Sequence, residues 1–280
     1  MAPPVVETDR DEYTGEFSGD KRQGEGRCSF ANGDVYEGSW YADVREGYGK
    51  LAYANGDTYE GGWHEDMRTG QGRQDYATGS WYVGSWLFDV ENGLGRGFLQ
   101  VPQRGVYEGE FKDGFPHGVG KFVYDNGDVY EGGFECGVRC GIGRCVTAVG
   151  AVFEGAWRDD VREGEGTEAW PNGDHYDGAW SNGARTGVGE MRYGTGDTFV
   201  GEWEANTRKN GCLTYATGDQ YTGEFVEDMR IGIGTCRFAN GDEYEGEWLN
   251  DLQDGEGICT YADGAVYTGT WIKGMRDGEG

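Results

Sequence analysis

Long hydrophobic segments are missing from this sequence of 280 residues. No apolar run of about 18 residues occurs, so no segment is predicted to span a membrane as a helix. The N-terminal stretch MAPPVVETDRDE lacks the apolar segment of a secretory signal peptide. Leu, Ile and Val seldom stand in runs, which argues against a thick aliphatic core. We therefore expect a cytoplasmic protein whose fold depends on other residues.

Basic residues are also scarce. The chain has 24 Lys and Arg against 51 Asp and Glu, which gives a formal net charge of −27. A surface of this sign repels nucleic acid and anionic lipid, because both carry negative charge. We therefore expect no nucleic-acid partner, and we expect any protein partner to be basic.

Glycine and aromatic residues are abundant instead, and they recur with a fixed period. There are 55 Gly, 10 Trp, 18 Tyr and 12 Phe. The segment ANGDVYEGSWYADVREGYGKL at 31–51 is followed by ANGDTYEGGWHEDMRTGQGRQ at 54–74. Such a period is the signature of a repeat architecture. We number each repeat from its leading aromatic residue as position 0, and the twelve leading residues are Tyr13, Tyr36, Tyr59, Tyr82, Tyr107, Tyr130, Phe153, Tyr176, Phe199, Tyr221, Tyr244 and Tyr267.

Each repeat predicts a β-hairpin. Position 2 is Gly and position 4 is aromatic in all twelve repeats, so positions 0, 2 and 4 form one face of a strand, with glycine leaving room for a ring. Position 7 is Asp, Asn or Gly, residues that tolerate a left-handed turn. A second strand follows a G-x-G pair, and Asn-Gly-Asp or a variant leads into the next repeat. The predicted fold is all-β, an elongated single-layer antiparallel ribbon of tandem hairpins, about 110–120 Å long.

The segment YEGSWYADVREGYGKLAYANGD resembles the MORN repeat, the membrane occupation and recognition nexus motif. The motifs Y-x-G-x-W and G-x-G carry the resemblance. It covers residues 13–280 and leaves 1–12 as an N-terminal extension. It implies a single-layer antiparallel β ribbon that acts as a scaffold or interaction module. Because residue 280 falls halfway through a repeat, we expect the last repeat to be incomplete and the sequence to be a fragment.

The aromatic face predicts a docking surface for a protein. A single layer has no second sheet to cover this face, and a twisted trough of rings suits a basic or amphipathic helix or an extended peptide. The alternative interpretation is that the rings only pack on one another. The stretch 93–106 and the short repeat at 199–220 break the regular spacing, so we place the surface on the regular run that begins at 107. Its ten rings are Tyr107, Phe111, Tyr130, Phe134, Phe153, Trp157, Tyr176, Trp180, Phe199 and Trp203.

Arginine occupies position 9 in nine repeats, where we expect a hairpin turn. A row of arginines along one edge could bind phospholipid headgroups. The competing interpretation is local charge balance, with Asp43 and Glu46 beside Arg45 as an example, and the net charge favours it. The candidate lipid-binding residues are Arg139, Arg162, Arg185 and Arg208.

Position 14 is basic in the first six repeats, as at Lys50 and Lys121. We expect these side chains to face acidic residues at position 3, such as Glu110, across the strand pair. Later repeats carry Thr167 and Glu190 at the same position, so the two halves of the ribbon differ in chemistry.

No catalytic or metal-binding arrangement is predicted. The G-x-G pairs lack the GK[ST] and the helix of a phosphate-binding loop. Four of the seven cysteines stand at position 15, which other repeats fill with Leu, Phe or Met, and Cys136 and Cys140 lack two further ligands for zinc. The three histidines lie in different repeats, at His64, His117 and His175. We therefore predict no enzyme, no metal and no cofactor.

Three functional hypotheses remain. The first is a non-catalytic scaffold in a cytoskeletal, ciliary or flagellar (axonemal) assembly, which would place the protein on the cytoskeleton. The second is a membrane-tethering module that binds phospholipid through the periodic arginines. The third is the regulatory region of a larger enzyme. Association end to end or as a homodimer is left open.

Overall fold

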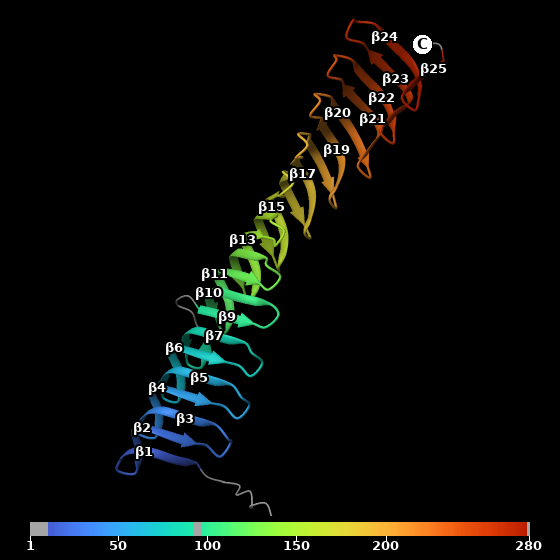
Figure 1. The fold of residues 1–280 in the computed structure, drawn as a ribbon. Coiled ribbons are helices and arrows are strands. Elements are labelled where there is room, and N and C mark those ends of the chain that lie inside the picture. Colours follow the sequence, from blue (N-terminus) through green and yellow to red (C-terminus); the bar gives the residue numbers. More distant parts are fainter. Residues whose placement is uncertain (1–10, 92–96, 279–280) are drawn as a thin grey trace, which may run out of the picture. The chain divides into compact units, whose positions relative to one another are not determined.

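A computed structural model describes residues 11–91 and 97–278 as strands and turns, with no helix among them. The chain divides into two compact units, Met1–Arg139 and Cys140–Gly280 (Figure 1). The first unit contains β1 (Glu12–Ser18), β2 (Lys21–Ser29), β3 (Val35–Tyr41), β4 (Val44–Ala52), β5 (Thr58–His64), β6 (Met67–Asp75), β7 (Trp81–Leu87), β8 (Val90–Glu91), β9 (Gly97–Val101), β10 (Gly105–Lys112), β11 (Phe115–Tyr124) and β12 (Val129–Glu135). The division falls within β13 (Val138–Val146), and the second unit continues with β14 (Val152–Arg158), β15 (Val161–Ala169), β16 (His175–Ser181), β17 (Ala184–Arg192), β18 (Thr198–Glu204), β19 (Thr207–Thr214), β20 (Gln220–Val226), β21 (Met229–Arg237), β22 (Glu243–Leu249), β23 (Leu252–Thr260), β24 (Val266–Ile272) and β25 (Met275–Asp277).

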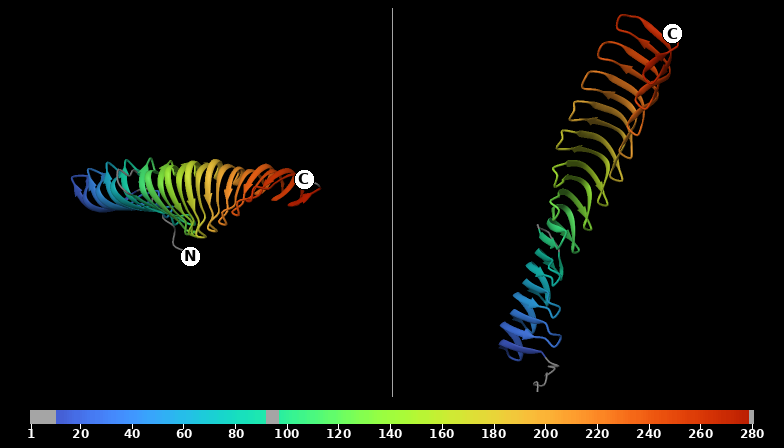
Figure 2. Two further views of the ribbon diagram at one scale, coloured as in Figure 1. Left: turned by 90° about the horizontal axis from the view of Figure 1, so that it is seen from above. Right: turned by 45° about the vertical axis from the view of Figure 1, so that its right-hand side comes forward.

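The predicted fold, tandem antiparallel hairpins in a single open sheet layer, is confirmed in both units. In a regular repeat the first strand pairs with the second, as β3 does with β4, and the second strand pairs with the next repeat, as β4 does with β5. The hairpins within each unit curve toward the same side (Figure 2). Residues 93–96 of the irregular stretch lie outside the described residues, and β9 forms from part of the remainder.

From the hairpin of β3 and β4 onward, the turn inside each hairpin has two residues in the left-handed region. Ala42 has φ 49° and Asp43 has φ 76°, and Glu65 and Asp66 repeat the pattern with 47° and 66°. Positive φ at both central residues belongs to a type I′ turn, whose twist matches that of the flanking strands. The sequence predicted this conformation for position 7, and the structure adds position 6, where residues other than glycine adopt it.

The turn between repeats is tied to the equivalent turn of the following repeat. Gly33, in the Asn-Gly-Asp segment, has φ 93°, and its N–H donates to the carbonyl oxygen of Phe30 at 2.9 Å. Asp34 Oδ1 accepts a hydrogen bond from the N–H of Ala54 in the next repeat at 2.8 Å. The same bond recurs from Ala77 to Asp57 and along the second unit. A row of carboxylates therefore holds successive turns together at this edge.

The strand register decides which side chains share a face. Tyr36 lies opposite Leu51 and Gly38 opposite Gly49, and a bulge then brings Trp40 opposite Arg45. Positions 0, 2, 4, 9, 13 and 15 therefore share one face, which we call the aromatic face and which also includes the rings that follow the second strand, such as Tyr193 and Tyr215. Positions 1, 3, 12 and 14 share the opposite face, which we call the polar face.

This register corrects the pairing expected at position 14. Lys50 lies opposite Glu37 and Glu60, which are position-1 residues, because the bulge displaces position 3 from it. Lys50 Nζ is 3.7 Å from a carboxylate oxygen of Glu60, and Lys121 Nζ is 2.7 Å from Glu131. Lys50 and Lys121 are therefore neutralised by Glu at position 1, whereas Arg73 pairs with Asp75 of its own strand.

The core of each unit is a row of rings packed over glycine. The Tyr36 ring meets Trp40 at 5.1 Å and Trp63 of the next repeat at 5.4 Å, in both cases edge to face. Tyr36 is fully buried. A Cβ added at Gly49 would lie 2.2 Å from the Tyr36 hydroxyl, so only glycine fits beneath the ring, as the sequence predicted.

Candidate functional site

The ten rings predicted as a docking surface are part of this core. Each is at most 6% exposed. In the second unit the Tyr176 ring meets both Trp180 and Trp203 edge to face at 5.4 Å. This burial favours the alternative interpretation, that the rings pack on one another, because they leave a partner almost no area to contact. A partner on the aromatic face would instead contact the side chains that border the rings.

An arginine from position 9 covers the rings from above. Arg230 Cζ lies 4.3 Å from the ring centroid of Trp248 and 5.5 Å from that of Tyr221. Its Nε is 3.0 Å from Asp251 Oδ1, and Nη2 donates to the Asp251 carbonyl oxygen at 2.7 Å. The Arg230 side chain is only 17% exposed. Ring stacking and the carboxylate together fix the guanidinium over the aromatic row.

Several of the position-9 arginines pair with the following repeat rather than with their own. Arg45 pairs with Asp66 of the next repeat at 2.9 Å, rather than with Asp43 or Glu46 of its own repeat. Arg45 also lies inside β4 rather than in the turn. The adjacent turn of the following repeat places its position-7 carboxylate against the guanidinium. The expected basic edge is therefore a row of paired cations on the aromatic face.

The four arginines considered for lipid binding follow this arrangement. Arg208 pairs with Asp228 at 2.8 Å, and Arg185 donates to the carbonyl oxygen of Asn206 at 3.1 Å. The remaining two are Arg162, which pairs with the buried Glu168 at 2.9 Å, and Arg139, which lies 5.5 Å from the centroid of Tyr130. These contacts engage the guanidinium groups that an anionic headgroup would need.

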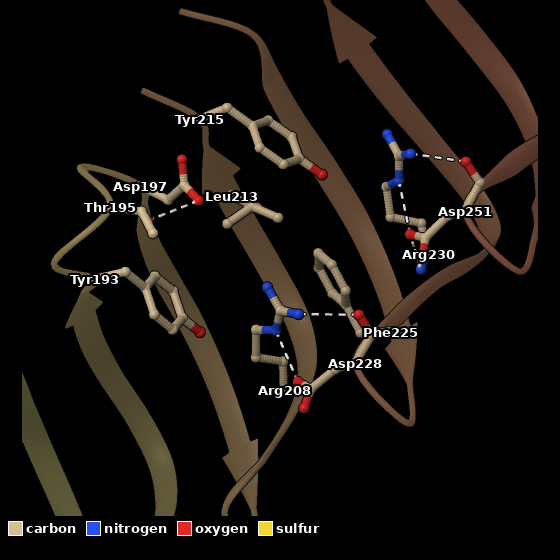
Figure 3. Close-up of a pocket in the computed structure, with 10 residues that line it drawn as sticks. All are labelled: Tyr193, Thr195, Asp197, Arg208, Leu213, Tyr215, Phe225, Asp228, Arg230 and Asp251. Atoms are coloured by element: carbon tan, nitrogen blue, oxygen red, sulfur yellow. Dashed lines mark hydrogen bonds and ion pairs between the residues drawn. The ribbon is translucent and has the colours of Figure 1, made fainter. Parts of the chain in front are cut away.

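A groove of about 640 Å³ lies on the aromatic face of the second unit. The half-buried rings of Tyr193 and Tyr215 border it, with Leu213 between them, and the pairs of Arg208 with Asp228 and Arg230 with Asp251 lie across from them (Figure 3). An equivalent groove of about 500 Å³ in the first unit is lined by Arg22, Phe30, Asp34, Asp43 and Arg45, among others. The groove thus belongs to the repeat rather than to one place in the chain.

The groove offers several hydrogen-bonding groups. Burial raises the pKa of the Tyr193 and Tyr215 hydroxyls, while the nearby arginines lower it by less. Both hydroxyls are therefore neutral donors at pH 7. The lining of the larger groove holds three carboxylates and two guanidinium groups, so it is slightly negative. An arrangement of this kind suits a polar or basic polypeptide.

The sequence does contain a signal for the Arg–Asp pairs, but it becomes visible only when adjacent repeats are compared. Where position 9 is Arg and the following repeat carries Asp or Asn at position 7, the described pairs form. Where the following repeat carries Gly instead, position 9 is Glu91, Pro116 or Gln253, with Arg162 as the exception. Comparing adjacent repeats would therefore have predicted the pairs.

The cysteines and histidines form no second site in the described part of the chain. All seven cysteines are free, and those at position 15 are buried, as expected for small apolar residues. Burial raises the pKa of Cys236 to about 11, so its thiol stays protonated. Among the described residues no three potential metal ligands gather, and no helix has the length and hydrophobicity to cross a membrane.

Comparison with protein families gives a match over most of the chain. The family model described as MORN repeat matches residues 13–35, 36–58, 59–81, 107–129, 130–152, 153–175, 176–198, 221–243, 244–266 and 267–280. The two repeats that it passes over, 82–106 and 199–220, are those with irregular spacing. A comparison with curated proteins finds no match.

Several solved structures are distantly similar. The TCP10 domain of Danio rerio CPAP, in complex with a peptide of Danio rerio STIL, is 12% identical over 93% of this chain and 100% of that one, with a TM-score of 0.35. The SAS-4 (dCPAP) TCP domain of Drosophila melanogaster, in complex with a proline-rich motif of Ana2, is 14% identical over 64% and 87%, with a TM-score of 0.32. Virginiamycin B lyase from Staphylococcus aureus is 11% identical over 95% and 91%, with a TM-score of 0.16. These TM-scores are too low to support any inference about the function of this chain.

Proposed function

The chain belongs to the MORN-repeat family, and we propose that it is a non-catalytic scaffold that binds a protein partner along the groove of its aromatic face. MORN repeats form modules for protein interaction or membrane binding. The observation that carries the proposal is the repeating groove, in which half-buried aromatic side chains stand opposite Arg–Asp pairs. The partner would contact these borders, since the rings beneath them are closed to solvent.

The dimensions of the repeat favour an elongated partner. Two strands per repeat give a spacing of about 9.6 Å along the ribbon. Two turns of an α-helix advance about 10.8 Å, and three residues of an extended chain advance about 10 Å. Either form can present equivalent side chains to successive repeats. The net charge of −27 favours a basic partner and would speed its approach.

The other hypotheses have less support. A lipid headgroup would have to compete with carboxylates for Arg208 and with a buried carboxylate for Arg162. Regulation of an attached catalytic domain would depend on chain outside this sequence. MORN-repeat proteins occur in cytoskeletal and ciliary assemblies, and this is the basis on which we propose a cytoskeletal location.

The proposal is tested by isolating a partner and then altering the groove. The full chain would serve as bait in an extract of ciliated cells, with mass spectrometry of the captured proteins. The dissociation constant of the leading partner would then be measured for Tyr193→Ser combined with Tyr215→Ser. The matched control combines Ile142→Ser with Val188→Ser on the polar face, where both residues are exposed.

We expect the tyrosine variant to weaken binding at least about tenfold, from two lost side-chain contacts. The control should bind as the unaltered chain does. Unchanged affinity of the tyrosine variant, with its fold verified by circular dichroism, would exclude the groove as the binding site.

A further inference from the structure

A second groove lies on the polar face, near the end of the second unit. Gly246 pairs with Gly257 across β22 and β23, and a Cβ on either would point into the Tyr244 ring on the aromatic face. On the polar face the two glycines carry no side chain and form the buried floor of a groove, and the flanking side chains form its walls on both sides. The groove has a volume of about 370 Å³, with Ile233, Ile258 and Thr268 among its lining residues.

The walls of this groove combine exposed aliphatic side chains with carboxylates. Ile233 is 65% exposed and Ile258 is 45% exposed. Glu245 and Glu256 line the same groove, and Glu247 lies opposite Ile233 on the neighbouring strand. Solvent-exposed isoleucines beside Gly246 and Gly257 offer apolar surface that a partner can cover.

The carboxylates here lack the basic neighbours that they have elsewhere. In earlier repeats a basic residue at position 14 neutralises the adjacent Glu, as Arg144 does for Glu154 at 2.8 Å. In these last repeats position 14 is Thr235 or Ile258. Within the described part of the chain, no lysine or arginine lies within ion-pair distance of Glu245, Glu247 or Glu256. This part of the polar face therefore carries uncompensated negative charge.

We propose that this groove, lined by Ile233, Glu245, Glu256 and Ile258, binds an extended lysine- or arginine-rich segment of a partner protein. The aliphatic stem of a basic side chain would lie over the glycines against the isoleucines, with its cationic group at a carboxylate. The width of the groove decides against a helix. Its walls come from residues two apart in a strand, about 6.8 Å, whereas a helix is about 10–12 Å across.

The test uses the full chain and a fluorescein-labelled oligolysine peptide, with fluorescence anisotropy at about 150 mM salt, where distant charges are screened. One variant combines Glu245→Gln with Glu256→Gln, and another combines Ile233→Ser with Ile258→Ser. The charge-matched control combines Glu37→Gln with Glu60→Gln on the polar face of the first unit. All six residues lie on the strand surface, and Glu60 pairs with Lys50 at 3.7 Å.

We expect each groove variant to weaken binding about fivefold and the control to change it less than about twofold. Equal losses in the glutamate variant and the control would mean attraction by net charge alone and would overturn the proposal. Unchanged binding of the isoleucine variant would also overturn it, because the apolar contact would then be absent. The variant of Tyr193 and Tyr215 should bind oligolysine normally, which separates this groove from the one on the aromatic face.

Discussion

Arg230 reaches out of its own repeat to Asp251 in the next one, and the two residues share four hydrogen bonds, one of which runs from the Asp251 N–H to the Arg230 carbonyl oxygen at 3.2 Å. The backbone N–H and Nε of Arg230 donate to Asp251 Oδ1 at 3.0 Å each, and Nη2 donates to its carbonyl oxygen at 2.7 Å. Asp251 holds φ 67°, so its left-handed turn presents carboxylate and carbonyl to the same guanidinium. The turn of one hairpin is thereby fixed to the strand of another.

Replacing Asp251 should destabilise this junction. Asp251→Gly keeps the left-handed turn, which the chain itself builds with Gly at Gly274, but removes the carboxylate that accepts from the backbone N–H and Nε of the half-buried Arg230. We expect the free energy of unfolding to fall by about 1–3 kcal/mol. Asp251→Asn should cost less than half as much, because Asn206 accepts the equivalent bond from Arg185. Urea unfolding followed by circular dichroism measures both, and equal losses would show that the side-chain acceptor is unimportant.

Adding a Cβ under a ring should be far more harmful than adding one at Gly70, which lies in β6. A Cβ at Gly49 would meet the Tyr36 hydroxyl at 2.2 Å and Cζ at 2.4 Å. We expect Gly49→Ala to destabilise by about 3 kcal/mol or more, because the buried ring has no room to move. Gly70 has φ 64° and open space around its Cβ direction, so Gly70→Ala should cost only about 1 kcal/mol of backbone strain. Thermal unfolding of the two variants gives the comparison, and similar losses would contradict the packing argument.

The fold could be predicted from the sequence because one repeat contains its determinants. The contact of Tyr36 with Gly49 lies inside a single hairpin, and twelve copies of the pattern exposed it. The pair of Arg45 with Asp66 was missed because its partners stand 21 residues apart, in adjacent repeats. In the sequence alone, carboxylates closer to Arg45, such as that of Asp43, account for the balance of its charge equally well.

The burial of the rings was harder to predict than their position. Tyr176 and Tyr193 are both tyrosines of the aromatic face, yet the first is fully buried and the second is half-buried. The difference arises because Tyr176 is enclosed by two tryptophans, one of them from the next repeat. Sequence periodicity identifies a face, but the neighbouring repeat decides which of its rings a partner can reach.

Alkaline pH should weaken the fold through the buried tyrosines. Burial raises the pKa of Tyr176, Tyr221 and Tyr244 from 10.0 to about 12. Between these values the unfolded chain loses protons that the folded chain keeps, so the free energy of unfolding falls as pH rises. We expect no contribution from these groups to the pH dependence below about pH 9, and a progressive loss of stability from pH 10 to 12. Tyr221→Phe should make the decline shallower in a pH series of urea midpoints, and an unchanged slope would contradict the assignment.

The pair of Arg162 with Glu168 allows the sharpest test of how a buried charge is tolerated in the ribbon. Glu168 occupies position 15, where other repeats place Leu51 or Met191, and it is only 6% exposed. Arg162 lies 2.9 Å from it and 4.6 Å from the centroid of Phe153. The following repeat offers Gly183 in place of the usual aspartate, so Glu168 takes over as the acceptor. The carboxylate can be accommodated in the core only while the guanidinium is present.

Arg162→Ala should therefore destabilise the chain by about 3–5 kcal/mol, since it leaves an unpaired buried charge. Glu168→Leu should be neutral or stabilising, because leucine fits this position in other repeats and Arg162 retains its rings. The double variant should recover most of the loss, giving a coupling energy of about 2 kcal/mol or more in a double-mutant cycle of urea unfolding. Additive effects would mean that Arg162 acts through ring stacking alone. In that case Arg162→Ala would lower the free energy of unfolding by the same amount whether residue 168 is Glu or Leu.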